Sequence, residues 1–322
     1  MIKLVGRELG VIGEDEHRSG WPYVLRCLEP MISDKGILFD DFIEASFAYH
    51  PIRSPHLEPW VGVFHQPYDA PEFLQPPGLS IGSILKSPMF KASLPYLKLG
   101  ITLSSPLGAW LQKTLDVPFV TLIHPTEIPE VAFSETAFLA NKKRRIIQIG
   151  CYLRNTSAIY QLKVPDDYTK TRLLLETQWE KEYMNRVAVL WQDYNWGNRW
   201  NQKKADRLPC GTVENSGRVS DAIYDRLLSE NVVFIEFFSA SASNTIVECI
   251  VRNTPLVVNR LPALEEYLGK DYPLFFDRIE DATELFALDK IFAGHSYLKR
   301  LDKRPLTGEY FRSHLIGALR SM

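Results

Sequence analysis

The chain has 322 residues, 45% of them hydrophobic and 24% charged, and a formal net charge of −2 at pH 7. This balance is ordinary for a globular protein, and it argues against a nucleic-acid partner, which usually leaves a basic excess. The four cysteines are far apart and form no C-x-x-C pair, so we expect neither a disulfide framework nor a zinc site. No apolar run approaches the roughly 18 residues of a membrane span, and no signal-peptide core is present, so we expect a cytoplasmic protein, with peripheral membrane contact left open.

Apolar, β-rich segments alternate with helical patterns along the chain, which is typical of parallel α/β sheets. The strands expected in the first half are 60–64, 100–103 and 119–123. A helix that begins at Ser105, capped by Ser104 or Ser105, is expected between the last two. The proline- and glycine-rich stretch 51–95 is expected to be mostly irregular outside its strand.

The second half repeats the alternation. The strands expected there are 144–150, 187–191, 232–238, 255–259 and 273–276, and the helices are 220–228, 245–252 and 263–268. A last amphipathic helix spaces Phe311, Leu315 and Leu319 four residues apart. The polar stretch 125–144 separates the halves, so we divide the chain into two α/β domains, 1–140 and 141–322; the resemblance described below makes the first the acceptor-side domain and the second the nucleotide-sugar-binding domain.

Seven small or polar residues, 239–245, lie between the strand at 232–238 and the next helix. Ligands of open parallel sheets bind at the carboxyl ends of strands, and the first turn of a helix leaves about four N–H groups unpaired. Small side chains admit an anion there, and Ser243, Asn244 and Thr245 add donors, so the loop predicts a phosphate or diphosphate site. Simple helix capping by the same residues is the alternative.

Glu248 follows about one turn into this helix, where its carboxylate can accept ribose hydroxyls; the alternative is an exposed glutamate favoured by the helix dipole. The segment from this strand through "NTPLVV" resembles the donor-binding half of GT-B-type glycosyltransferases, especially the large retaining family that includes sucrose and glycogen synthases. The resemblance extends to "RRIIQIGCYLRNTSAIY" and "GTVENSGRVSDAIYDRLLSENVVFIEFF", and more loosely to "VGVFHQPYDAPEF" in the first half.

This resemblance implies an α/β protein of two Rossmann-like domains that face each other across a cleft, with the last helix packing back on the first domain. It implies a hexosyltransferase that moves a sugar from a nucleoside-diphosphate sugar to an acceptor hydroxyl, on a glycan or polysaccharide. The family generally needs no metal, and the sequence shows no D-x-D motif. We therefore expect no metal and no cofactor other than the donor substrate.

The resemblance also assigns roles to individual residues. Val219 would lie near the nucleotide base, Glu248 at the ribose and His65 at the transferred sugar. Catalytic contributions are expected from His65, Arg154 and Glu248. The residues implied at the diphosphate are Gly20, Gly150, Arg154, Ser241, Ser243, Asn244 and Thr245.

One departure from the family leaves alternatives open. The family usually carries two glutamates separated by seven residues, but the position eight before Glu248 is Ala240. The donor sugar and the stereochemical outcome are therefore open; in an inverting reaction His65, Asp69 or Glu72 would be the candidate base. A non-catalytic nucleotide-sugar or glycan binding relative is the main alternative. A nicotinamide-dependent oxidoreductase lacks support, because no G-x-G-x-x-G follows a strand.

Three further features can be explained by a purely structural role. The aromatic-rich stretch 191–200 could stack on sugars or pack locally, and His124 is expected to serve as a hinge or to pack. Glu265 and Glu266 are expected on a solvated helix face.

Overall fold

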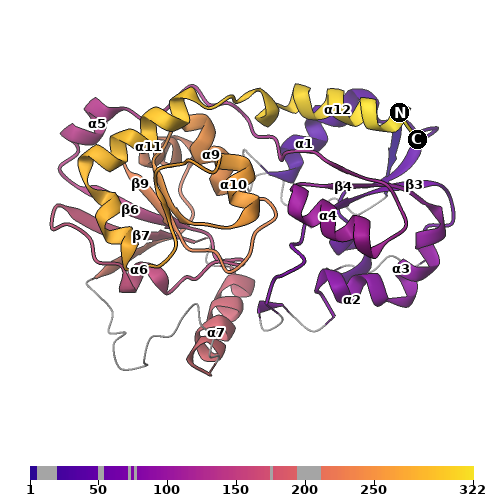
Figure 1. Cartoon of the computed structure of the whole chain (residues 1–322), viewed down its shortest axis with the longest axis horizontal. Coiled ribbons are helices and arrows are strands. Elements are labelled where there is room, and N and C mark those ends of the chain that lie inside the picture. The colour runs from indigo at the N-terminus through magenta and orange to yellow at the C-terminus, as the bar shows by residue number, and fades with distance from the viewer. Residues whose placement is uncertain (6–19, 50–53, 72–73, 76–77, 175–176, 194–211) are drawn as a thin grey trace.

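The computed structural model describes residues 1–5, 20–49, 54–71, 74–75, 78–174, 177–193 and 212–322. Two parallel sheets form the two halves of the molecule (Figure 1). The first sheet has the order β1-β2-β3-β4-β5 and the second β11-β10-β9-β6-β7-β8. The strands of the first sheet are β1 (Ile2–Leu4), β2 (Ile37–Asp40), β3 (Trp60–Phe64), β4 (Leu97–Thr102) and β5 (Phe119–Thr121). Those of the second are β6 (Arg144–Ile149), β7 (Tyr168–Leu173), β8 (Val213–Ser216), β9 (Val232–Ile235), β10 (Leu256–Asn259) and β11 (Phe275–Phe276).

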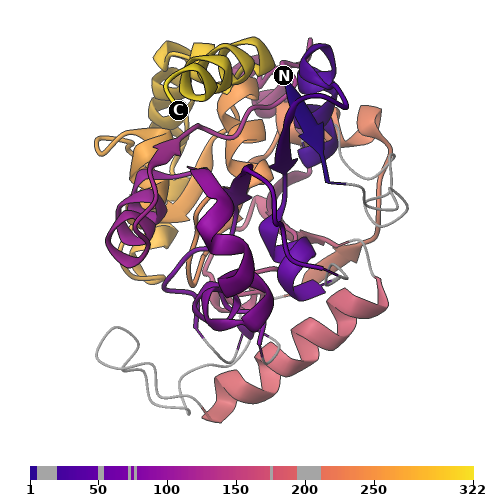
Figure 2. The ribbon, with the colours of Figure 1, turned by 90° about the vertical axis from the view of Figure 1, so that its right-hand side faces the viewer.

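Helices lie against both sheets (Figures 1 and 2). Those of the first half are α1 (Trp21–Leu28), α2 (Ile81–Lys86), α3 (Pro88–Ser93) and α4 (Ser105–Thr114). Those that follow are α5 (Glu135–Ala140), α6 (Ala158–Gln161), α7 (Gln178–Asp193), α8 (Asp221–Ser229), α9 (Asn244–Arg252), α10 (Pro262–Leu268), α11 (Leu288–Arg300) and α12 (Gly308–Arg320).

Strands β3 and β9 are apolar along their whole length, as expected where helices cover both faces of a parallel sheet. Every residue of β3, β9 and β10 is buried. The segments predicted as strands at 60–64, 100–103, 119–123, 144–150, 232–238, 255–259 and 273–276 all contain strands. The predicted α/β class with two Rossmann-like halves is therefore confirmed.

Several predictions of local structure are wrong. Segment 187–191 belongs to α7, where the helix-forming residues that precede it carry the helix through. The described part of stretch 51–95 is irregular at 54–59, 65–71 and 78–80, as expected, but the stretch also contains the unpredicted helices α2 and α3. Four strands went unpredicted, β1, β2, β7 and β8. Of these, β8 ("VENS") is polar and lies at the edge of its sheet, so it lacks the apolar pattern of a buried strand.

The last helix returns to the first half, as predicted. Phe311 and Leu315 of α12 share a core with Trp21 and Val24 of α1. Both termini therefore lie on the same side of the molecule (Figure 1). The division at residue 140 stays a prediction; Phe138 of α5 packs in the core of the second sheet.

Candidate functional site

The second sheet reverses its strand order between β6 and β9. Read from β8, its strands follow as third, second and first and then fourth, fifth and sixth in chain order. In sheets of this kind ligands bind outside the carboxyl ends of the strands at the point of reversal. The segment after β6 carries Gly150 and Arg154, and the segment after β9 is the small-residue loop 239–245. The topology thus brings the two sequence segments predicted to hold a diphosphate to one place.

The turn after β6 is held against the end of β9. The Asn155 N–H donates to the Glu236 carbonyl at 2.7 Å, and the Phe238 N–H donates to the Leu153 carbonyl at 2.8 Å. Gly150 has φ +70°, and a Cβ at this position would lie 1.8 Å from Nη1 of Arg154. A glycine is therefore needed both for the turn and for the space that the guanidinium occupies.

The Arg154 guanidinium covers the start of α9. Its Nη2 donates to Ser243 Oγ at 3.1 Å and to Thr245 Oγ1 at 3.3 Å, and the guanidinium lies 5.3 Å from the centre of the Phe237 ring. Its Nε is buried without a hydrogen-bond partner, and no carboxylate among the described residues forms an ion pair with it. Burial lowers the pKa of Arg154. A partly desolvated cation thus lies beside the positive end of a helix, an arrangement that an anion would stabilise.

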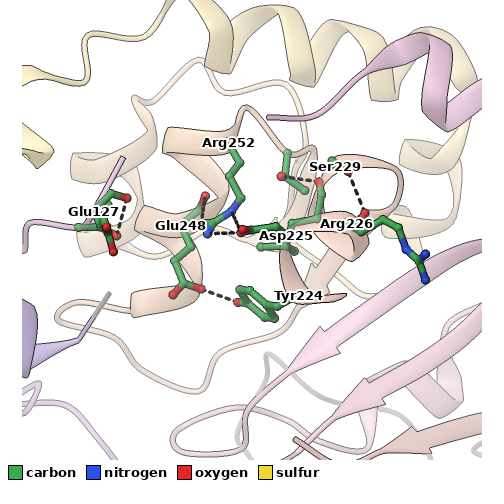
Figure 3. A network of polar contacts seen from close by, with 10 residues as sticks. Glu127, Tyr224, Asp225, Arg226, Ser229, Glu248 and Arg252 are labelled. Atoms are coloured by element: carbon green, nitrogen blue, oxygen red, sulfur yellow. Dashed lines mark hydrogen bonds and ion pairs between the residues drawn. The ribbon is translucent and has the colours of Figure 1, made fainter. Parts of the chain in front are cut away.

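Glu248 faces the interior rather than solvent, so the alternative of an exposed helix glutamate is wrong. It is 5% exposed, and the Tyr224 hydroxyl of α8 donates to its Oε2 (Figure 3). Burial, and then the neighbouring Glu248 carboxylate, raise the pKa of Tyr224 well above its usual value, so the hydroxyl stays protonated and donates. Tyr224 was not predicted; it lies 24 residues from Glu248 in the sequence.

Arg252 closes the network at the other end of α9 (Figure 3). Its Nη2 and Nε donate to Asp225 Oδ1 at 2.8 and 3.2 Å, and its Nη1 donates to the Glu248 carbonyl at 3.4 Å. Arg252 is 2% exposed, so this is a buried ion pair. It fixes α8 against α9 and thereby places Tyr224 beside Glu248.

Loop 239–245 also touches the first half of the molecule. Ser241 Oγ lies 3.0 Å from Ser104 Oγ, and Ser239 Oγ donates to Asp69 Oδ1. Ser104 occupies the N-cap position of α4 but makes no capping bond with its side chain. Instead Glu266 of α10 accepts from the Ser105 N–H at 2.7 Å and from Ser105 Oγ at 2.5 Å.

Glu266 is exposed, as expected, although its carboxylate also makes these contacts with α4. The neighbouring Tyr267 hydroxyl donates to the Leu103 carbonyl at 2.6 Å and accepts from the His124 N–H at 3.1 Å. His124 is buried, and burial lowers its pKa to about 4, so the ring is neutral at pH 7. Its surroundings fit the packing role expected for it.

His65 follows β3 in the first half. Its backbone N–H donates to Glu44 Oε1 at 2.7 Å, and its Nδ1 lies 3.4 Å from Glu44 Oε2. The rings of Trp21 and Phe42 each lie 4.4 Å from the imidazole, and both ring nitrogens are buried with no hydrogen-bond partner in the described ranges. Gly20 directly precedes Trp21 at the N-cap of α1, so the structure places it near His65. Glu44 is fully buried. It was not predicted, because its contact with His65 joins two separate segments of the first half and no local sequence pattern indicates such a contact.

The remaining predicted positions are more peripheral. Asn244 is the first residue of α9 and is half-buried. Val219 packs beside Ile147, Leu173 and Leu227, a core contact that does not by itself indicate a base site. Glu72 and residues 194–200 of the aromatic stretch lie outside the described residues.

Two parallel-sheet halves, with facing strand ends and a last helix that returns to the first half, define the GT-B fold of glycosyltransferases. The chain matches no model of a known protein family and no curated protein sequence. Solved structures show the fold. Anabaena Alr3699/HepE in complex with UDP and glucose superposes with a TM-score of 0.60 at 12% identity, over 94% of this chain and 82% of that one.

Two further solved structures agree. The α,α-trehalose 6-phosphate synthase from Burkholderia multivorans gives a TM-score of 0.57 at 11% identity, over 92% of this chain and 73% of that one. An E. coli structure described as trehalose-6-phosphate bound with UDP-2-fluoro glucose gives 0.56 at 11% identity, over 93% and 76%. The predicted resemblance to GT-B glycosyltransferases is thus confirmed at the level of the fold.

Proposed function

We propose that this chain is a hexosyltransferase that transfers a sugar from a nucleoside-diphosphate sugar to an acceptor hydroxyl. Three of the solved structures that share its fold contain, by their descriptions, UDP with glucose, UDP-glucose or UDP-2-fluoro glucose. We further propose that the acceptor hydroxyl belongs to a glycan or polysaccharide, that the reaction needs no metal ion and that the protein is cytoplasmic. No helix in the described part of the chain is long and apolar enough to cross a membrane.

One observation carries the proposal: the Arg154 guanidinium lies over the start of α9, and within the described part of the chain its hydrogen-bond partners are neutral hydroxyls. A cation is unfavourable at a helix N-terminus, where the macrodipole is positive, and burial removes the water that would screen it. A bound diphosphate would replace this repulsion with attraction, because its negative charge is attracted both to the guanidinium and to the positive end of α9. An arginine fork binds phosphate oxygens in pairs, and the free N–H groups of the first helical turn add further donors.

The roles of the other residues follow from this placement. Gly150 leaves room for the guanidinium, and Ser241, Ser243, Asn244 and Thr245 line the path of the diphosphate. Glu248, oriented by Tyr224, accepts ribose hydroxyls. In the transition state, negative charge grows on the leaving diphosphate, and Arg154 and the start of α9 stabilise it because they are already oriented. His65, between its two aromatic rings, contacts the transferred sugar.

The test is a thermal-shift and calorimetric screen of UDP, GDP and ADP. A nucleotide present at 100 times its dissociation constant stabilises the fold by about 2.7 kcal/mol, which either method detects. We expect Arg154→Ala to lose most of this response, whereas the control Arg278→Ala, at an exposed arginine, keeps it. If none of the three nucleotides shifts the wild-type transition, the proposal fails.

A binding protein without turnover is the second candidate, and Ala240 favours it, because its methyl group offers no functional group to a sugar. Release of nucleoside diphosphate from a panel of UDP-, GDP- and ADP-sugars distinguishes the two. Slow donor hydrolysis or transfer supports the enzyme; tight binding with no turnover on any acceptor supports the binding protein.

A further inference from the structure

The segment that follows β2 packs against His65. Asp40 Oδ1 accepts from the Phe42 N–H at 3.3 Å, so the turn at the end of β2 is held by its own side chain. The turn leads into a π-helix, Ala45–Tyr49, a rare conformation that is frequent at functional sites. In this way Phe42 and Glu44 reach the carboxyl end of β3, where His65 begins the next loop.

The Glu44 carboxylate contacts both the backbone and the ring of His65. Its Oε1 accepts from the N–H groups of His65 and Gln66 at 2.7 and 2.8 Å, which fixes the carboxylate at the end of β3. Its Oε2 lies 3.4 Å from His65 Nδ1. This separation is long for a hydrogen bond, as catalytic contacts often are before substrate binds. A carboxylate only accepts hydrogen bonds, so a ring nitrogen that bonds to it must carry the proton.

Two aromatic rings hold the imidazole in this orientation. The ring centres of Trp21 and Phe42 each lie 4.4 Å from that of His65, at interplanar angles of 85° and 62°. Trp21 is itself fixed, because its Nε1 donates to Asp41 Oδ2 at 2.8 Å. The His65 side chain is 17% exposed and that of Glu44 is 0% exposed, so the ring rather than the carboxylate reaches the surface. In the part of the chain that the structure describes, His65 Nε2 has no hydrogen-bond partner, which leaves an acceptor for a substrate hydroxyl.

We infer that Glu44 is a positioning residue that keeps the ring proton of His65 on Nδ1, so that Nε2 is the base for the acceptor hydroxyl. The inference rests on the proposed function, and it selects His65 among the candidate bases that the sequence leaves open. The acceptor O–H gives its proton to Nε2 while its oxygen bonds to the anomeric carbon of the donor. The electron pair of the breaking C–O bond leaves with the diphosphate, and the Glu44 carboxylate stabilises the imidazolium that forms.

The decisive variant is Glu44→Gln. Its amide oxygen can still accept from the two backbone N–H groups, but its NH2 group would donate to Nδ1, so the proton of a neutral ring moves to Nε2. A substrate hydroxyl can either donate or accept and therefore binds beside both forms of the ring, whereas only an unprotonated Nε2 takes its proton. We expect kcat to fall by roughly 10²–10⁴-fold, the usual contribution of a general base, with KM little changed. The matched control is Glu29→Gln, at an exposed glutamate of the same half.

Nitrogen NMR of labelled histidine reads the tautomer directly and needs no substrate. The His65 signals are those absent from the spectrum of His65→Gln, and they are recorded at a pH at which the ring is neutral. We expect the proton on Nδ1 in the wild type and in Glu29→Gln, and on Nε2 in Glu44→Gln. A proton on Nε2 in the wild type overturns the inference, whether or not the variant folds.

Turnover tests the role as a base. The rate is the release of nucleoside diphosphate from a panel of UDP-, GDP- and ADP-sugars, and the melting temperature reports whether each variant is folded. If the tautomer of Glu44→Gln changes and kcat does not, the inference is overturned; a fall in kcat without a change of tautomer marks a merely structural role and overturns it too.

Failure of the proposed function has a different outcome, because then the wild type neither binds a nucleoside diphosphate nor turns over any nucleotide sugar. The base role falls with it in that case. The NMR spectra of the wild type and of Glu44→Gln still decide whether Glu44 sets the tautomer of His65.

Discussion

An arginine side chain lies at each end of α9, and the two differ in the charge of their hydrogen-bond partners. Arg252, near the C-terminus, donates twice to the Asp225 carboxylate. Arg154, at the N-terminus, donates to the hydroxyls of Ser243 and Thr245 and to no carboxylate among the residues that the structure describes. The helix dipole favours a cation at the first position and disfavours it at the second. The comparison separates an arginine that is paired with a carboxylate from one that donates to neutral hydroxyls, at the helix end where the dipole would favour an anion.

Removing Arg252 should have the largest effect. Breaking a buried ion pair leaves an uncompensated charge and typically costs about 3–5 kcal/mol, so we expect Arg252→Ala to lower the free energy of unfolding by that amount. Urea denaturation measures it. The double variant with Asp225→Ala should recover part of the loss, and additive losses would contradict the pairing.

Removing Arg154 should affect binding rather than stability. Charge-assisted hydrogen bonds to phosphate contribute about 1.5–3 kcal/mol, so Arg154→Ala should weaken nucleoside diphosphate binding roughly 10- to 150-fold. Without ligand, the free energy of unfolding should change by less than about 1 kcal/mol, because the lost partners are neutral hydroxyls. If Arg154→Ala lowers the free energy of unfolding as much as Arg252→Ala does, then Arg154 also stabilises the fold, and the proposed difference between the two arginines is wrong.

Gly150→Ala tests whether the glycine acts through Arg154. The new methyl group would meet Nη1 of Arg154 at 1.8 Å and force the guanidinium away from α9. A left-handed conformation costs a non-glycine residue about 1–2 kcal/mol, so we expect a stability loss of that size and weaker nucleotide binding. In a double-mutant cycle, Arg154→Ala should add little further loss of affinity; full additivity would mean that the glycine acts independently.

The smallest effect is expected at the hydroxyls. Ser243→Ala and Thr245→Val each remove one neutral partner of Arg154, and a neutral hydrogen bond contributes about 0.5–1.5 kcal/mol. Nucleotide affinity should fall no more than about tenfold in each. Isothermal titration calorimetry at one ionic strength measures this, with Ser313→Ala on α12 as the control.

The β9–α9–β10 unit was predictable because each of its elements carries its own pattern: a fully apolar strand, a small-residue loop and an amphipathic helix. Strand β8 was not, because "VENS" at the sheet edge has no apolar face to mark it. The resemblance singled out Arg154, which follows a predicted strand end, and Glu248 was singled out by its place one turn into a predicted helix; their roles stay predictions.

The side chains that hold these residues did not follow from the sequence. Tyr224 and Asp225 meet Glu248 and Arg252 only once α8 packs on α9. The contact of Asp69 with Ser239 joins residues 170 positions apart. Local patterns place backbone elements, whereas contacts between elements depend on how the halves pack, which no short motif encodes.

Glu266 belongs to α10, yet it completes the first turn of α4 by accepting from Ser105. If the halves part, α4 loses its acceptor and the Tyr267 hydroxyl loses the Leu103 carbonyl at the same moment. Separation of the halves would therefore cost the capping contacts of α4 as well as the contacts between the two sheets' strand ends.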